Sequence, residues 1–94
     1  MIASYRDKET ERFARGQRNL KWEAFRQQVE KRLRILEAAG NLNDLQVLRS
    51  NNLEALKGNR KGQFSVRINE QWRICFSWPK GSPGPVNVEF VDYH

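Results

Sequence analysis

The chain has 94 residues, 30% of them charged, and a formal net charge of +6 at pH 7. The length predicts one domain over residues 1–94. The positive charge favours a polyanionic partner, with nucleic acid ahead of an acidic protein or a membrane surface, or else serves solubility alone. One cysteine excludes an internal disulfide, no run of about 18 apolar residues could span a membrane, and the first residues are charged too early for a signal peptide. We therefore expect a soluble, cytoplasmic protein without a membrane partner.

The N-terminal residues predict a short strand followed by a short helix. Met1–Tyr5 is mostly apolar and could join a sheet formed later in the chain, as an edge or a central strand. Asp7–Ala14 starts with a capping aspartate and is followed by Gly16, which favours a helix. Its apolar face is chiefly Phe13, so we expect it to persist only when packed against other elements.

The strongest helix signal lies between Asn19, a suitable N-cap, and Gly40, a suitable stop. An apolar stripe recurs along it at three- and four-residue steps and predicts core packing rather than a cofactor site. The stripe consists of Trp22, Phe25, Val29, Leu33 and Leu36. The opposite, basic face is either solvated or available to an RNA.

The next segments return the chain to the sheet. Residues 41–52 are polar and predict a loop with at most one helical turn. Leu53–Lys57 then predicts a strand, and Gly58–Gly62 predicts a tight turn that carries Arg60 and Lys61.

Two apolar series after this turn alternate with polar residues: Phe64, Val66 and Ile68, then Trp72, Ile74 and Phe76. Such alternation predicts two strands, each with one buried face. A three-residue loop at residues 69–71 pairs Val66 with Ile74 and keeps one face apolar throughout. The same register sets Arg67 opposite Arg73 on the other face, where like charges repel unless they are solvated or share an anion.

Residues 79–85 hold three prolines and predict a rigid loop, and Val86–Tyr93 predicts the last strand. Pairing Trp78 with Val86 sets Ile74 against Phe90, and Arg73 against Val91. The two registers bring five residues to one edge of one sheet: Arg67, Arg73, Asp92, Tyr93 and His94. The order of elements predicts an α+β fold with two N-terminal helices on one face of a twisted, mainly antiparallel sheet.

These residues suit acid–base chemistry on a phosphate ester. One histidine and one cysteine cannot form a zinc site, and we expect neither a metal nor a cofactor. RNA is cleaved when its own 2′-OH attacks the neighbouring phosphate, which requires a base, an acid and cations. His94 titrates near neutral pH, Arg67 and Arg73 offer planar cations, and Tyr93 offers a ring that stacks on a base or relays a proton. Each residue alone also has an ordinary structural explanation, such as a frayed terminus for His94.

Four segments of the sequence resemble HigB-type toxins, which belong to the RelE toxin superfamily and the plasmid maintenance killer family of type II toxin–antitoxin systems. The segments are Ser4–Thr10, Leu56–Asn69, Gln71–Phe76 and Val88–His94. The resemblance covers nearly the whole chain and implies the α+β fold predicted above. It also implies an mRNA interferase, an endoribonuclease that cleaves translated mRNA in the ribosomal A site without a metal and so inhibits translation.

The resemblance also implies partners and site residues. The implied partners are mRNA on the ribosome and a HigA-type helix-turn-helix antitoxin. Contact with operator DNA would be indirect, through the antitoxin only. By position, the terminal motif of the family falls on Asp92, Tyr93 and His94, and its catalytic-face cation falls on Arg73. Its basic turn falls on Lys57, Arg60 and Lys61, which together with Arg67 would bind RNA.

Glu54 marks a departure from that pattern. Some members carry a histidine of the active site in the strand that precedes the Leu-Lys-Gly motif, whereas this chain has Glu54. Glu54 either acts as a base, as glutamates do elsewhere in the superfamily, or is a salt-bridge partner that leaves more of the chemistry to Tyr93 and His94.

Two other classes of function fit the same sequence. A non-catalytic RNA- or ribosome-binding module would use the same basic face, and a protein-interaction domain would use its charge only to match an acidic antitoxin.

Overall fold

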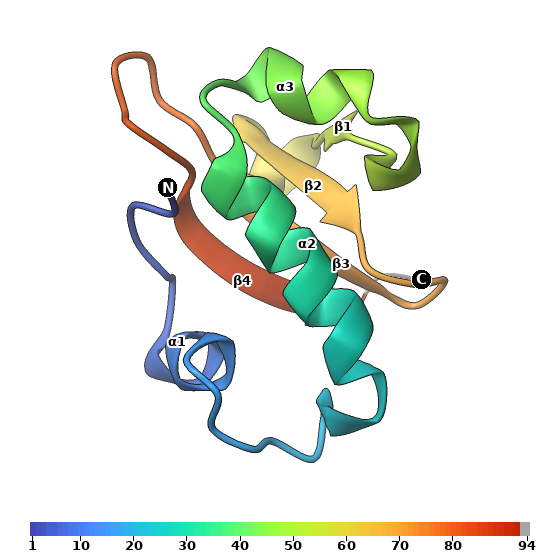
Figure 1. Ribbon diagram of the computed structural model, residues 1–94. Coiled ribbons are helices and arrows are strands. Elements are labelled where there is room, and N and C mark those ends of the chain that lie inside the picture. The colour runs from blue at the N-terminus through green and yellow to red at the C-terminus, as the bar shows by residue number, and fades with distance from the viewer. Residues whose placement is uncertain (93–94) are drawn as a thin grey trace.

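A four-stranded antiparallel sheet with the order β1-β2-β3-β4 lies at the centre of the computed structural model (Figure 1), which describes residues 1–92. The strands are β1 (Glu54–Ala55), β2 (Gln63–Arg67), β3 (Trp72–Ser77) and β4 (Val86–Asp92). The predicted α+β class is confirmed. Within the described residues, no helix combines the length and apolarity needed to cross a membrane.

The β2–β3 hairpin has the predicted register. Val66 pairs with Ile74 and Arg67 pairs with Arg73. Asn69 explains the three-residue loop, because its Oδ1 accepts hydrogen bonds from the backbone amides of residues 71 and 72, both at 2.8 Å. Val66 and Ile74 are fully buried on one face, as the apolar alternation requires.

The β3–β4 pairing is partly as predicted. Ile74 pairs with Phe90 and Arg73 pairs with Val91, but Val86 pairs with Ser77 rather than with Trp78. The register shifts at a β-bulge, where β4 contains one residue more than β3. Asn87 lies within the bulge at a φ of 54°, a left-handed conformation that asparagine tolerates better than most residues.

The N-terminal residues run along the free edge of β4, as Figure 1 shows. Tyr5 forms an isolated parallel bridge with Val88, and the amide of Ala3 donates to the Pro85 carbonyl at 2.8 Å. The predicted strand is therefore reduced to a single bridge. Helix α1 (Lys8–Ala14) follows, and the Asp7 carboxylate caps it by accepting from the Thr10 amide at 2.7 Å.

Helix α2 (Arg26–Ala38) crosses one face of the sheet, but it begins later than predicted. Asn19 instead caps a tight turn, since its carbonyl accepts from the amides of Trp22 and Glu23. A 3₁₀ turn, η1 (Glu23–Phe25), then leads into α2. The predicted apolar stripe still packs as core, because Trp22, Val29, Leu33 and Leu36 are buried.

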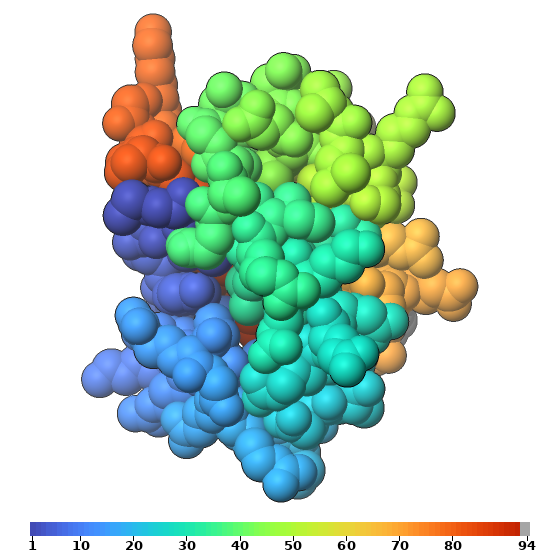
Figure 2. Space-filling view, in the orientation of Figure 1, coloured from blue at the N-terminus to red at the C-terminus, as the bar shows by residue number. Residues whose placement is uncertain are grey.

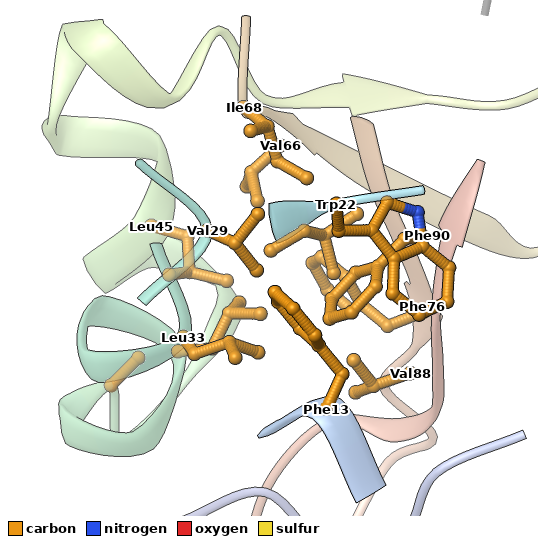
Figure 3. Packing of buried hydrophobic residues seen from close by; sticks show 13 residues of the cluster. Phe13, Trp22, Val29, Leu33, Leu45, Val66, Ile68, Phe76, Val88 and Phe90 are labelled. Carbon is orange, nitrogen blue, oxygen red and sulfur yellow. The ribbon is translucent and has the colours of Figure 1, made fainter. Parts of the chain in front are cut away.

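Aromatic rings dominate the core between the helices and the sheet (Figure 3). The ring of Trp22 lies 4.8 Å from that of Phe90 and 5.3 Å from that of Phe13, in edge-to-face geometry. Phe13 thus connects α1 to β4, with its ring 5.9 Å from Phe90. These contacts supply the tertiary packing that the short helix α1 requires.

Residues 41–52 are more ordered than the predicted loop. They form helix α3 (Leu42–Val47) and a 3₁₀ turn, η2 (Arg49–Asn51), at the end of the molecule where β1 lies (Figure 1). Asn41 caps α3, its Oδ1 accepting from the Asp44 amide at 3.0 Å, and Leu45 is buried. Strand β1 is shorter than predicted, and a 3₁₀ turn, η3 (Gly58–Arg60), occupies the predicted basic turn.

Candidate functional site

The candidate site lies on the sheet face opposite α2. Side chains alternate between the two faces of a strand, so Arg67 and Arg73 point away from the face that holds Val66 and Ile74. This confirms the predicted pairing of the two arginines across the hairpin.

Arg73 is far more buried than a residue on an uncovered face would be. Its exposed fraction is 9%, because the chain at residues 52–54 folds over it. Its Nε donates to Ser65 Oγ at 2.7 Å, and its Nη2 donates to the Asn52 carbonyl. Arg73 therefore lies on the face that α2 leaves free, but this part of the face is covered: the guanidinium is anchored by neutral acceptors and lies beside a carboxylate.

That carboxylate belongs to Glu54. Its Oε1 lies 3.7 Å from Arg73 Nη1, and its side chain remains 56% exposed. Strand β1 positions it, since Glu54 pairs with Ser65, the residue whose hydroxyl group accepts from Arg73. Glu54 is thus held beside the buried cation while its own oxygens stay accessible to solvent.

Arg67 completes a cleft of about 330 Å³. Its Nε donates to the Asn69 carbonyl at 3.2 Å, and no carboxylate among residues 1–92 lies within ion-pair distance of it. The described residues that line the cleft are Asn52, Glu54, Arg67, Asn69, Glu70 and Arg73. The structure therefore brings together three of the predicted site residues: Glu54, Arg67 and Arg73.

Asp92 is placed differently. It pairs with Trp72, so the strand alternation puts it on the α2 side of the sheet rather than on the side of Arg73. Its Oδ2 accepts from Gln71 Nε2 at 3.0 Å, and it is not among the described residues that line the cleft. Tyr93 and His94, the other two residues of the predicted terminal motif, lie outside the described residues.

The predicted basic turn divides into two parts. Lys57 and Lys61 are exposed, whereas Arg60 Nη1 donates to Glu89 Oε2 at 3.1 Å and to Gln63 Oε1 at 3.0 Å. Glu89 also lies 3.6 Å from the guanidinium of Arg6. Arg60 therefore ties η3 to strands β2 and β4.

Glu89 is a residue that the sequence reasoning missed. It pairs with Cys75, which pairs with Ser65, so all three share the face of Arg73. The predicted register of β3 and β4 already contained this signal, because Val91 facing Arg73 places Glu89 two residues along on the same face.

Cys75 occupies the centre of this face and is fully buried. Burial is the main cause that raises the pKa of its thiol to about 11. Nearby charges have smaller effects on this pKa: the cations Arg60 and Arg73 lower it, and the carboxylate of Glu89 raises it. The thiol is protonated at neutral pH and is a poor nucleophile, since the thiolate is the reactive form.

The arrangement suits a phosphodiester. Two guanidinium groups in one cleft can hold a phosphate, and the neighbouring carboxylate can accept a proton. A larger hollow of about 690 Å³ lies between the N-terminal segment, α1 and α2 (Figure 2), but none of the predicted site residues lines it.

The chain is similar to known proteins along most of its length. A family model described as the RelE-like toxin of the type II toxin–antitoxin system HigB matches residues 3–94. Toxin HigB-1 of Vibrio cholerae serotype O1 is 43% identical over 51 residues, which are 54% of this chain and 54% of that relative. Endoribonuclease HigB of Proteus vulgaris is 32% identical over 68 residues, 70% of this chain and 68% of that relative. The match thus spans about half the length of the first relative and about two thirds of the second.

Proposed function

The chain belongs to the HigB-like toxins, the RelE-like toxins of type II toxin–antitoxin systems, and on this premise we propose that it is an endoribonuclease that cleaves translated mRNA on the ribosome. The observation that best supports this proposal is the cleft of about 330 Å³ in which Glu54, Arg67 and Arg73 meet. The endoribonuclease name of the Proteus vulgaris relative supports the same class of reaction.

The proposed reaction uses the 2′-OH of the RNA as its nucleophile. The 2′ oxygen attacks the adjacent phosphorus, the bond from phosphorus to the 5′ oxygen breaks, and the products are a 2′,3′-cyclic phosphate and a 5′-OH. One proton leaves the 2′-OH and one is given to the 5′ oxygen, so the protein supplies a base and an acid and no metal takes part.

The cleft residues have distinct roles in this proposal. Arg67 contacts the phosphate directly, because its described partner is a neutral carbonyl rather than a carboxylate. Arg73 adds a second, fixed positive charge that requires no reorganisation as negative charge builds on the phosphate oxygens. Glu54, which is half-exposed and lies beside Arg73, would accept the 2′ proton.

The family pattern supplies the remaining roles. Tyr93 would stack on a base and His94 would exchange protons with the RNA, either as the acid opposite Glu54 or as the base. Exposed Lys57 and Lys61 would bind the phosphates of mRNA or ribosomal RNA. Asp92 would have an indirect role at the edge of the sheet, where it accepts a hydrogen bond from Gln71. Arg60 would hold the basic turn in place through its contact with Glu89.

The partners follow from the family. A type II toxin acts together with a protein antitoxin, and we propose that here it is a HigA-type helix-turn-helix protein. Contact with operator DNA would then pass through the antitoxin alone.

Translating ribosomes with a defined mRNA would test the proposal. The purified chain should generate new mRNA 5′ ends, mapped by primer extension, and Arg67→Gln should reduce their yield at least about tenfold. Arg12→Gln is the matched control, since Arg12 is an exposed arginine on α1 that does not line the cleft. Stalled ribosomes with an intact message would instead indicate a non-catalytic binder, and unaltered translation would indicate a protein-interaction domain.

A further inference from the structure

The η2 turn is held by an arginine on each side. Arg32 of α2 donates from Nη1 to Asn51 Oδ1 at 2.9 Å and to Ser50 Oγ at 3.2 Å. Arg73 of β3 donates to the carbonyl of Asn52, the residue that ends the turn with a φ of 46°. The turn and the two guanidinium groups therefore form one fixed unit beside the cleft.

A second cleft, of about 430 Å³, opens on the α2 side of this unit. Gln28, Arg32 and Ser50 line it. Four further residues line both clefts: Asn52, Arg67, Asn69 and Glu70. The two clefts therefore adjoin beside α2, the η2 turn and the β2–β3 loop, three segments that meet at the right-hand edge of Figure 2, and we call the two clefts together the groove.

The α2 end of the groove presents a cation without a carboxylate partner. Arg32 donates to neutral oxygens, and no carboxylate among residues 1–92 lies within ion-pair distance of it. Burial lowers the pKa of Arg32 from its ordinary value, which indicates a guanidinium that has lost part of its hydration. Glu70, the acidic residue that lines this part of the groove, is exposed at the tip of the hairpin loop.

We propose that single-stranded RNA lies along the whole groove and that Arg32 binds a backbone phosphate outside the scissile bond. Three arginines from three elements then follow one path: Arg73 and Arg67 in the first cleft and Arg32 in the second. The side-chain amides of Gln28, Asn52 and Asn69 line the path between them and can hydrogen-bond base edges or sugar hydroxyls.

The position of the scissile bond in the first cleft rests on the function proposed above, whereas RNA binding at Arg32 requires no cleavage. The salt dependence of this binding follows the number of phosphates that the protein neutralises.

A binding experiment with an uncleavable RNA tests the proposal. A fluorescein-labelled 2′-O-methyl oligonucleotide of about ten nucleotides lacks the nucleophile, and its affinity is measured by anisotropy between about 50 and 200 mM salt. Gln28→Glu should weaken binding at least about fivefold, while Gln27→Glu, the same charge change one position away and outside the groove, should weaken it less than about twofold. Arg32→Gln should reduce the slope of log affinity against log salt by about 0.7, the value for one phosphate of a single strand.

Gln28 keeps the test decisive if Arg32→Gln perturbs the η2 turn, because Gln28 is exposed and makes none of the described contacts that hold the turn. Equal affinities for Gln28→Glu and Gln27→Glu, or no binding by the wild type at about 50 mM salt, would overturn the groove proposal. Selective weakening by Gln28→Glu in a chain that cuts no mRNA would support the groove and count against the nuclease. If the wild type cleaves mRNA but the Gln28→Glu and Gln27→Glu variants bind RNA equally well, the result would support the nuclease and count against the groove.

Discussion

Replacing Arg73 with alanine is expected to weaken the fold as well as to remove a cation from the cleft. Arg73 is buried, and its guanidinium donates hydrogen bonds to the Ser65 hydroxyl and to the Asn52 carbonyl. Alanine would leave the buried Ser65 hydroxyl and the partly buried Asn52 carbonyl without their donor. The variant therefore differs from an ordinary loss of surface charge.

The size of the effect follows from these contacts. A hydrogen bond from a charged group contributes about 1.5–3 kcal/mol, so the two together contribute about 3–6 kcal/mol. The Glu54 ion pair adds less than about 1 kcal/mol, because that carboxylate is half-exposed. The free energy of unfolding of a domain of this size is about 5–14 kcal/mol in total. Loss of the Arg73 contacts should therefore lower the melting temperature by at least about 12 °C.

Urea unfolding followed by circular dichroism measures this loss, and Arg67→Ala is the matched control. Arg67 lies directly opposite Arg73, makes one described hydrogen bond at 3.2 Å and is only half-buried. Because this longer contact is partly open to solvent, its removal should cost less than about 1 kcal/mol, although both variants should lose RNA cleavage. An Arg73→Ala chain within about 1 kcal/mol of the wild type would refute the view that this arginine anchors the chain at residues 52–54.

Three further outcomes test the fold. Phe13→Ala should cost about 3–5 kcal/mol in urea unfolding, because Phe13 is 1% exposed, whereas Leu20→Ala, at a leucine that is 95% exposed, should change stability by less than about 0.5 kcal/mol. Asp7→Ala should cost about 1 kcal/mol through loss of the cap on the Thr10 amide, and an unchanged midpoint would contradict that role. Burial raises the pKa of the Cys75 thiol to about 11 from 9.0, so the stability from the protonated thiol is present below pH 9.0 and is lost as pH rises toward 11. The free energy of unfolding should accordingly fall more between about pH 8 and pH 10.5 in the wild type than in Cys75→Ala.

The hairpin could be predicted because one constraint determined it. Val66 and Ile74 share the buried face only when the loop has three residues, and a slip of one residue would move one of the two to the opposite face of the sheet. The bulge in β4 could not be predicted in the same way. Val86 and Phe90 alternate with polar residues whether or not an extra residue is present, and Asn87 alone, tolerant of a left-handed φ, marks the place.

The amount of helical structure at residues 41–52 was underestimated, because the residues that stabilise this segment are polar. Asparagine is ordinarily exposed, yet Asn51 is fully buried: its Nδ2 donates to the Leu45 carbonyl at 2.9 Å and its Oδ1 accepts from Arg32. Such burial depends on partners 6 and 19 residues away along the chain, which local propensity cannot indicate.

The sequence predicted the residues that the sheet contributes to the candidate site. It did not predict that the chain at residues 52–54 covers Arg73. Strand alternation correctly set Arg67 beside Arg73, and the pairing of Trp72 with Asp92 could also have shown that Asp92 faces the α2 side. The burial of Arg73 depends on where the chain at residues 52–54 returns, which no periodicity encodes. The roles of Tyr93 and His94 remain predictions.

The chain at residues 48–54 covers part of the sheet face opposite α2 and so builds the walls of the site. Two arginines on a bare face would be hydrated and would repel each other, so binding a phosphate would first require them to be desolvated and oriented. Here the Asn52 carbonyl and the Ser65 hydroxyl hold Arg73 in place before any ligand arrives, and Arg32 fixes the same turn from α2. Because preorganised dipoles and charges stabilise a transition state at little reorganisation cost, Asn51→Ala should impair RNA cleavage more than RNA binding, although Asn51 is fully buried and lines neither cleft.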